Sequence, residues 1–173
     1  AENTVKLEIA LVWLAKFVKA ATQIEKKNLL QRKLNMKILG IGNAIVDVIC
    51  KIDDKFLLDN GLTKSTMKLV DEDEFKKLIG NLKIEKTISG GSVANSIVGL
   101  SQLGNEVGFI GKVNNDVLGK KYLDGLEKEH VKFHYDIKSE KLSTGTCLIL
   151  ITPDSERTMC TFLGIAGKIS EVD

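Results

Sequence analysis

The sequence predicts an α/β protein in which a globular part is preceded by one long helix. From residue 36 onward, short apolar segments rich in β-branched residues alternate with segments of helical spacing, a pattern typical of a sheet with helices packed on it. Residues 1–39 contain neither glycine nor proline, whereas all 15 glycines follow from Gly40 onward. This shift in composition predicts a boundary near residue 35, with an extension over residues 1–35 and the globular part over residues 36–173.

The extension is predicted to form one helix from Val5 to Leu34. Apolar residues spaced four and three apart form a single stripe, namely Leu7, Leu11, Leu14, Val18 and Ala21. Such an amphipathic helix packs on its own domain or on a second copy, and less often lies on a membrane surface. Because Met36 opens a typical start, residues 1–35 also fit a leader, a fusion or read-through from upstream. For this reason no function is assigned to them.

In the globular part, apolar runs and helical spacing predict the elements in order. Strands are expected at residues 36–42, 43–53, 106–113, 146–152 and 157–163, and helices at residues 56–58, 73–82, 93–103 and 117–128. Asn115 and Asp116, just before the last helix, fit an N-cap. The turn that contains Pro153, the only proline, is expected to join the last two strands into a hairpin.

Composition narrows the classes of function. The formal net charge is +2 and aromatic residues make up 5% of the chain, which argues against a nucleic-acid-binding surface. The cysteines Cys50, Cys147 and Cys160 are odd in number and form no C-x-x-C pair, so we expect reduced thiols in a cytoplasmic protein and neither disulfides nor a zinc site. No apolar run approaches the length of a membrane span.

The sequence lacks three common binding motifs, although parts of each are present. LGIGNAIVD lacks the third glycine of a dinucleotide fingerprint, because Ile45 stands there. Two Gly-Lys pairs, at Lys112 and Lys168, are not followed by the Ser or Thr of a P-loop. His130 and His134 are four residues apart, but no acidic partner lies in a metal-binding frame, so exposed structural histidines are expected.

Asp47 is the residue that most needs an explanation, because it lies in the otherwise apolar segment AIVDVIC. Burying a carboxylate is costly unless its oxygens are satisfied. Either strand alternation turns Asp47 outward, or it faces a cavity and accepts hydrogen bonds from ligand hydroxyls, for which a vicinal diol has suitable spacing. In a regular strand Asn43 would share its face, and Gly91 and Asn95 would complete a polar cluster. Both alternatives remain open on the residues alone.

Five segments occur in a characteristic order: GIGNAIVDV, MKLVDEDE, SGGSVANS with LSQLG, FIGKVNNDVLG, and TGTCLILITPDSERTMCTFLG. Through them residues 36–173 resemble the N-terminal half of the ribokinase-like carbohydrate kinases of the phosphofructokinase B type, and within that family the bacterial adenosine kinase-like members. The resemblance implies a ribokinase-like three-layer α/β sandwich, present in part, with a small β-sheet lid over a sugar site. Lid strands are expected at residues 46–51, 67–70, 147–152 and 157–163.

The resemblance also implies which residues bind the substrate. A carboxylate at Asp47 would hydrogen-bond ribose hydroxyls, and the two adjacent glycines would let the ribose lie against the backbone. The expected sugar-binding residues are Asn43, Asp47, Gly90, Gly91 and Asn95, and the residues expected to line the base or apolar side are Met67, Leu69, Cys147, Cys160 and Phe162. The expected partner is a small nucleoside or sugar, with adenosine first and ribose or another sugar second.

One departure from the family is large. Its catalytic aspartate lies in a C-terminal Gly-Ala-Gly-Asp motif and its magnesium-organising residues in an Asn-x-x-Glu motif, and neither occurs in this sequence. The resemblance therefore implies an ATP- and Mg²⁺-dependent kinase, of which this chain is the substrate-binding half. On its own the chain is expected to be inactive, with no catalytic residue, bound cofactor or metal. The alternative is a non-catalytic sugar- or nucleoside-binding module, or one that self-associates.

Overall fold

The computed structural model describes residues 37–171 and 173. All of its elements belong to the unit Met36–Asp173. The helix predicted from Val5 to Leu34 lies outside the described residues.

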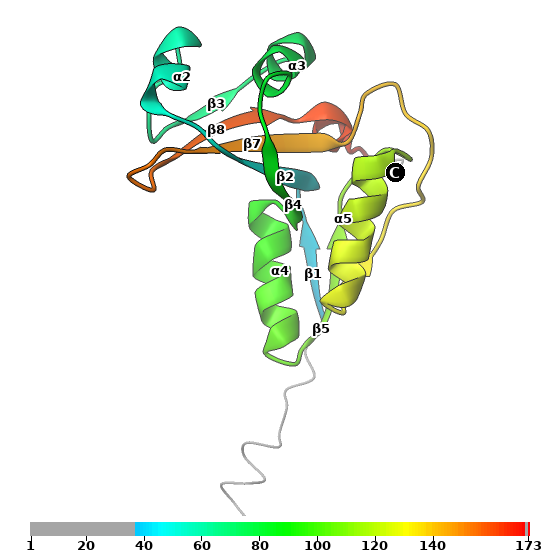
Figure 1. Ribbon diagram of the computed structural model, residues 1–173. Helices are drawn as coiled ribbons and strands as arrows, with labels where there is room; N and C mark the ends of the chain where they lie inside the picture. Colours follow the sequence, from blue (N-terminus) through cyan, green and yellow to red (C-terminus); the bar gives the residue numbers. More distant parts are fainter. Residues whose placement is uncertain (1–36, 172) are drawn as a thin grey trace, which may run out of the picture. The chain divides into compact units, whose positions relative to one another are not determined.

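The described chain forms two sheets (Figure 1). The first has the order β1-β5-β6, with both pairs parallel, and its strands are β1 (Lys37–Ile41), β5 (Glu106–Ile110) and β6 (Lys132–Phe133). The second, which we call the lid sheet, has the order β3-β8-β7-β2-β4. Its strands are β2 (Ile45–Lys51), β3 (Met67–Leu69), β4 (Ile84–Gly90), β7 (Gly145–Ile151) and β8 (Arg157–Phe162).

In the part of the chain that the structure describes, four α-helices and one 3₁₀-helix accompany the sheets. They are α2 (Asp54–Asp59), α3 (Glu72–Ile79), α4 (Ser92–Gln102), α5 (Val117–Lys128) and η1 (Gly164–Lys168). In Figure 1, α2 and α3 lie over the lid sheet, whereas α4 and α5 lie beside the three-stranded sheet. The helices α2, α3 and α5 are capped by Asp53, Asp71 and Asp116, respectively. Each aspartate side chain accepts a hydrogen bond from the backbone N–H three residues later in the chain, an N–H that would otherwise be unpaired.

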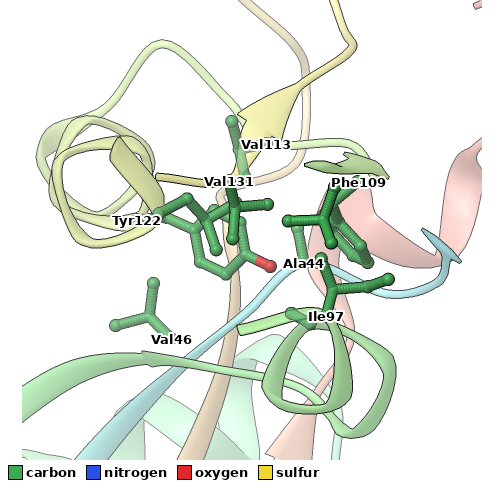
Figure 2. Close-up of a cluster of buried hydrophobic side chains, with 10 residues drawn as sticks. Ala44, Val46, Ile97, Phe109, Val113, Tyr122 and Val131 are labelled. Atoms are coloured by element: carbon green, nitrogen blue, oxygen red, sulfur yellow. The ribbon is translucent and has the colours of Figure 1, made fainter. Parts of the chain in front are cut away.

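The core of the three-stranded sheet lies under α4 and α5 (Figure 2). Phe109 of β5 and Tyr122 of α5 are fully buried there, with ring centroids 6.3 Å apart. Gly40 of β1 lets α4 approach closely, since a Cβ at that position would lie 2.6 Å from Cγ1 of Ile97. Helix α4 therefore packs directly on the backbone of β1.

A second core lies between the lid sheet and the two helices above it. Alternate residues of β2, β7 and β8 point into it, because successive side chains of a strand face opposite ways. These strand residues pack against Leu57 of α2 and Leu78 of α3. They are Val48, Cys50, Leu148, Leu150, Cys160 and Phe162. Fully burying a side chain of this size contributes roughly 1.5–3 kcal/mol, so this face of the lid sheet is a stable structural core.

Asp116 joins the two sheets through hydrogen bonds. Its Oδ1 accepts from the backbone N–H of Gly119 at 2.7 Å and from Oγ1 of Thr144 at 2.8 Å, while Oδ2 accepts from the backbone N–H of Thr144 at 2.9 Å. Thr144 is fully buried and immediately precedes β7. The segment FIGKVNNDVLG thus fixes both the start of α5 and the point where the chain enters the lid sheet.

The structure confirms the α/β fold class, the four expected lid strands to within two residues at each end, and the hairpin of β7 and β8. Strand β4 was not predicted, because the charged residues Glu85 and Lys86 hide its alternation. The continuous strand predicted over residues 43–53 is wrong at its start, since Asn43 lies between β1 and β2 and these two strands belong to different sheets. Among the described residues, helices cover only one face of the three-stranded sheet.

The hydroxyl of Tyr122 has no hydrogen-bond partner among the described residues, although the side chain is fully buried among Ala44, Val46 and Val131 (Figure 2). An unsatisfied buried hydroxyl costs about 1–3 kcal/mol. We therefore expect Tyr122→Phe to raise the free energy of unfolding by up to about 1 kcal/mol in urea denaturation.

The matched control is Tyr135→Phe, because the Tyr135 hydroxyl donates a hydrogen bond to Oε1 of Glu140 at 2.9 Å. This variant should lower the free energy of unfolding. An equal loss in both variants would mean that the Tyr122 hydroxyl has a hydrogen-bond partner after all.

Candidate functional site

Asp47 lies in a row of side chains that crosses the whole lid sheet. In the strand register it pairs with Ile88 of β4 and Cys147 of β7, Cys147 pairs with Thr161 of β8, and Thr161 pairs with Leu69 of β3. Residues directly opposite each other in a sheet point to the same face. The row therefore lies on the face away from α2 and α3, which we call the open face of the lid.

The Asp47 carboxylate is half-buried, and no hydrogen bond or ion pair reaches it from any described residue. Desolvation by burial raises its pKa above the ordinary value for an aspartate, because an apolar environment disfavours the charged form. A carboxylate in this state gains most from hydroxyl donors that a ligand brings. Of the two alternatives that the sequence left open, neither is decided by this geometry: Asp47 is neither fully exposed nor among the residues that line the cavity beside β4.

Contacts with Asp47 and Asn43 explain why glycine stands at both position 90 and position 91. A Cβ at Gly90 would overlap the Asp47 carboxylate, and a Cβ at Gly91 would lie 2.7 Å from the backbone oxygen of Asn43. Gly91 also has φ = 97°, a conformation that side-chain-bearing residues rarely adopt. Both glycines are thus required by the protein's own groups at this place, which is a different reason from the close approach of a ribose that the resemblance implied.

The two asparagines flank this arrangement. Asn43 is exposed in the connection from β1 to β2, and Asn95 is exposed in the first turn of α4, where its backbone N–H donates to the oxygen of Gly91 at 2.9 Å. Neither side-chain amide has a hydrogen-bond partner among the described residues. Asn95 and Gly90 also line a cavity of about 470 Å³ along the outer edge of β4, between α4 and α5.

Three of the five predicted apolar residues lie on the open face. Met67 and Leu69 of β3 are 56% and 59% exposed, and Cys147 is buried beside Asp47. Ile149 and Met159 form the next row with Met67, and these two residues were not predicted. Their spacing of two residues from Cys147 and Thr161 is the signal that identifies them.

The prediction that Cys160 and Phe162 line the apolar side of the site is wrong. They pair with Leu148 and Thr146, one residue out of step with Asp47, and therefore point to the opposite face, into the core beneath α2 and α3. Cys160 has no exposed surface. The prediction failed because neighbouring residues of one strand were placed on a single face, whereas a strand divides them between two faces.

A cluster of charges, which the sequence did not predict, follows β5. Nζ of Lys112 lies 2.6 Å from Oδ1 of Asp173 and 3.2 Å from Oε1 of Glu140, and all three side chains are largely buried. The hydrogen bond from Lys112 depresses the pKa of Asp173. Nζ of Lys138 lies 3.3 Å from Oδ1 of Asp173 and 3.9 Å from Oε1 of Glu140. Two lysines thus balance two carboxylates, and we assign the cluster to stability.

Within residues 37–171 and 173, no group of three or more His, Cys, Asp and Glu side chains is placed to hold a metal ion. His130 and His134 are exposed. None of the helices in this part of the chain is long and apolar enough to cross a membrane.

Comparison with known proteins gives the same assignment as the motifs. Residues 61–172 match the family described as pfkB family carbohydrate kinase. The chain belongs to this family. Its fold is similar to the crystal structure of adenosine kinase from Sinorhizobium meliloti, with a TM-score of 0.73, 34% identity, and coverage of 80% of this chain and 42% of that one.

Two further relatives belong to the sugar kinases. A probable sugar kinase protein from Rhizobium etli CFN 42 has a TM-score of 0.74 and 32% identity over 80% of this chain and 42% of its own. The 5-dehydro-2-deoxygluconokinase of Clostridium botulinum is 43% identical over 58 residues, which are 34% of this chain and 17% of that protein. The pfkB-family chain described here thus spans less than half the length of these relatives.

The raised pKa of Asp47 leads us to expect that the stability of the fold depends on pH. Because its folded-state pKa lies above that of the unfolded chain, protonated Asp47 favours folding, and this contribution is lost as the pH rises through the folded-state pKa. Each unit of that difference is worth about 1.4 kcal/mol. Asp47→Asn should therefore raise the free energy of unfolding at about pH 7 and change it little at about pH 3.5.

The measurement is urea unfolding of both proteins across this pH range. Asp136→Asn, at an exposed loop position, is the control and should leave the free energy of unfolding unchanged at both ends. A gain from Asp47→Asn that is the same at low and neutral pH would contradict the desolvated carboxylate.

Proposed function

We propose that this chain is the acceptor-binding part of an ATP-dependent sugar or nucleoside kinase that phosphorylates a ribose 5′-hydroxyl. The observation that carries the proposal is the half-buried Asp47 carboxylate, which no described residue satisfies, on the open face of a lid sheet in a member of the pfkB family. Its two oxygens accept hydrogen bonds from two neighbouring hydroxyls of the sugar. Because the site is partly desolvated, these charge-assisted bonds are stronger than in water.

The asparagines supply the remaining polar contacts of this proposed site. The side-chain amides of Asn43 and Asn95, on either side of the glycine pair, have no hydrogen-bond partner among the described residues, and an amide both donates and accepts hydrogen bonds. Gly90 keeps the Asp47 carboxylate in place, since any side chain there would displace it. Sugar recognition then depends on a rigid backbone feature and on three side chains.

The rest of the open face supports a nucleoside as the acceptor, with adenosine first. Neighbouring strands lie about 4.8 Å apart, so Cys147, Thr161 and Leu69 extend from Asp47 in steps of that size toward the edge of the lid, and Met159 lies in the next row. Side chains of this kind suit the flat face of a base, whereas a free sugar offers hydroxyls in every direction. The similarity to an adenosine kinase agrees with this choice, and the two sugar kinases make ribose or another sugar the second candidate.

Phosphoryl transfer requires that the donor be positioned and that the charge of the moving group be stabilised. The resemblance assigns these tasks to the Gly-Ala-Gly-Asp and Asn-x-x-Glu motifs, which are not in this sequence. We therefore propose that ATP and Mg²⁺ bind only when the rest of the kinase is present. The 173-residue chain alone binds the acceptor without turning it over.

Asp47→Ala should weaken adenosine binding by at least about 100-fold, because two charge-assisted hydrogen bonds of about 1.5–3 kcal/mol each are lost. Isothermal titration calorimetry on the 173-residue chain measures this, with ribose as the competing ligand. Asp136→Ala is the control and should bind as the unmodified chain does. Equal affinity of the Asp47→Ala variant and the unmodified chain would remove Asp47 from the sugar site.

A coupled assay for ADP tests whether the 173-residue chain can catalyse phosphoryl transfer without the rest of the kinase. A homogeneous sample of the 173-residue chain with adenosine, ATP and Mg²⁺ should release no ADP above the background of ATP alone. Turnover that disappears in Asp47→Ala would refute the proposal that the chain needs further parts, while it would support the acceptor site. Binding without turnover in every longer form would favour the non-catalytic binding module.

A further inference from the structure

The end of β4 is held from two sides. On one side the Asp47 carboxylate lies against the backbone of Gly90. On the other side is α5, which lies beside the last residues of β4 (Figure 1). Oγ of Ser89 donates a hydrogen bond to the backbone oxygen of Tyr122 at 3.0 Å. Because Ser89 directly precedes Gly90, this bond ties the chain next to the carboxylate to the backbone of α5.

Gly125 makes room for this contact between β4 and α5. A Cβ at residue 125 would overlap Oγ of Ser89 and lie 2.9 Å from the Ser89 Cβ. Gly125 lies inside α5, where glycine destabilises a helix relative to alanine. Gly99, inside α4, differs, since a Cβ there would meet no atom of the described residues within 4 Å. The space that Ser89 occupies is therefore a reason for glycine at residue 125 that does not apply at residue 99.

Ser89 and Gly90 face opposite sides of the lid sheet, as successive residues of a strand do. Ser89 pairs with Val46, which is fully buried in the core beneath α4 and α5, whereas Gly90 pairs with Ile45 on the open face. The strand end thus lies between α5 on one face and the Asp47 carboxylate on the other. A shift of Ser89 away from α5 would move Gly90 into the carboxylate.

We infer that Ser89 and Gly125 are positioning residues for the acceptor. Together they fix the distance between α5 and β4, and they thereby hold the Asp47 carboxylate where it accepts hydrogen bonds from the sugar hydroxyls. A binding site must be held within about 0.5 Å of its productive geometry by the residues around it, and a helix backbone in contact with a short side chain is rigid enough for this. The inference rests on the proposed function for the ligand, but the state of Asp47 can be measured without one.

Two matched substitutions in the 173-residue chain test the inference, because both add one methyl group to the interior of a helix. Gly125→Ala places a Cβ against Ser89, whereas Gly99→Ala places one where no described residue is near. The first measurement is the pKa of Asp47 from an NMR titration of its carboxyl carbon, whose resonance is assigned by its loss in Asp47→Asn. The second is the affinity for adenosine from isothermal titration calorimetry.

In Gly125→Ala the carboxylate is pushed out of its half-buried place. We expect the pKa of Asp47 to fall toward the ordinary aspartate value, because desolvation raises it in the unmodified chain. Adenosine affinity should fall at least about 10-fold, as for the loss of one charge-assisted hydrogen bond. Gly99→Ala should change neither quantity. Ser89→Gly combined with Gly125→Ala removes the overlap and should bring both quantities back toward those of the unmodified chain.

Ser89→Ala is a milder variant, since it removes the hydrogen bond to Tyr122 and adds no atom. It should shift the pKa of Asp47 and the adenosine affinity in the same direction by a smaller amount, and it keeps the test decisive if Gly125→Ala does not fold.

The inference is wrong if Gly125→Ala and Gly99→Ala behave alike, or if the double variant stays as impaired as Gly125→Ala. Adenosine binding that disappears in Asp47→Ala but is unchanged in Gly125→Ala and Ser89→Ala would refute the positioning contact and support the acceptor site. A pKa of Asp47 that falls in Gly125→Ala, with no adenosine binding by the unmodified chain, would support the positioning contact and refute the acceptor site.

Discussion

The contact between the Asp47 carboxylate and the bare backbone of Gly90 is the constraint on which the site depends. Because a side chain at residue 90 would displace the carboxylate, β4 must end in a glycine beside β2. Because Gly91 then turns with a positive φ under the Asn43 oxygen, α4 starts directly behind it. The carboxylate, the two asparagines and the helix start are thus fixed by a few backbone positions.

The two faces of the lid sheet differ sharply in burial. One face is closed by α2 and α3 and buries the larger aliphatic side chains of β2, β7 and β8. The other keeps Met67 and Leu69 exposed and leaves the Asp47 carboxylate without a partner among the described residues. Both features cost free energy in the unliganded protein. A bound ligand with an apolar part and neighbouring hydroxyls would offset both costs at once.

Local patterns in the sequence were sufficient to predict several features of the fold and of the candidate site. The carboxylate in an apolar strand, the glycine pair before a helix and the aspartate cap of α5 are visible within a few residues, and the structure has all three. The face to which each lid residue points was not visible, because it depends on register between strands that are far apart in sequence, and so Cys160 and Phe162 were misplaced. The pair of Lys112 and Asp173 joins residues 61 positions apart, for which no local signal exists.

Strand β1 and Asp47 are close together along the chain. Strand β1 ends at Ile41, two residues before Asn43, and leads through this connection into β2 and Asp47. In open α/β sheets ligands bind beyond the carboxyl ends of the parallel strands. Asn43 follows the carboxyl end of β1, so it lies where sheets of this class bind ligands, and Asp47 comes four residues later on β2. The short connection between the two sheets therefore places the proposed polar groups at the edge of the sheet where a ligand is expected.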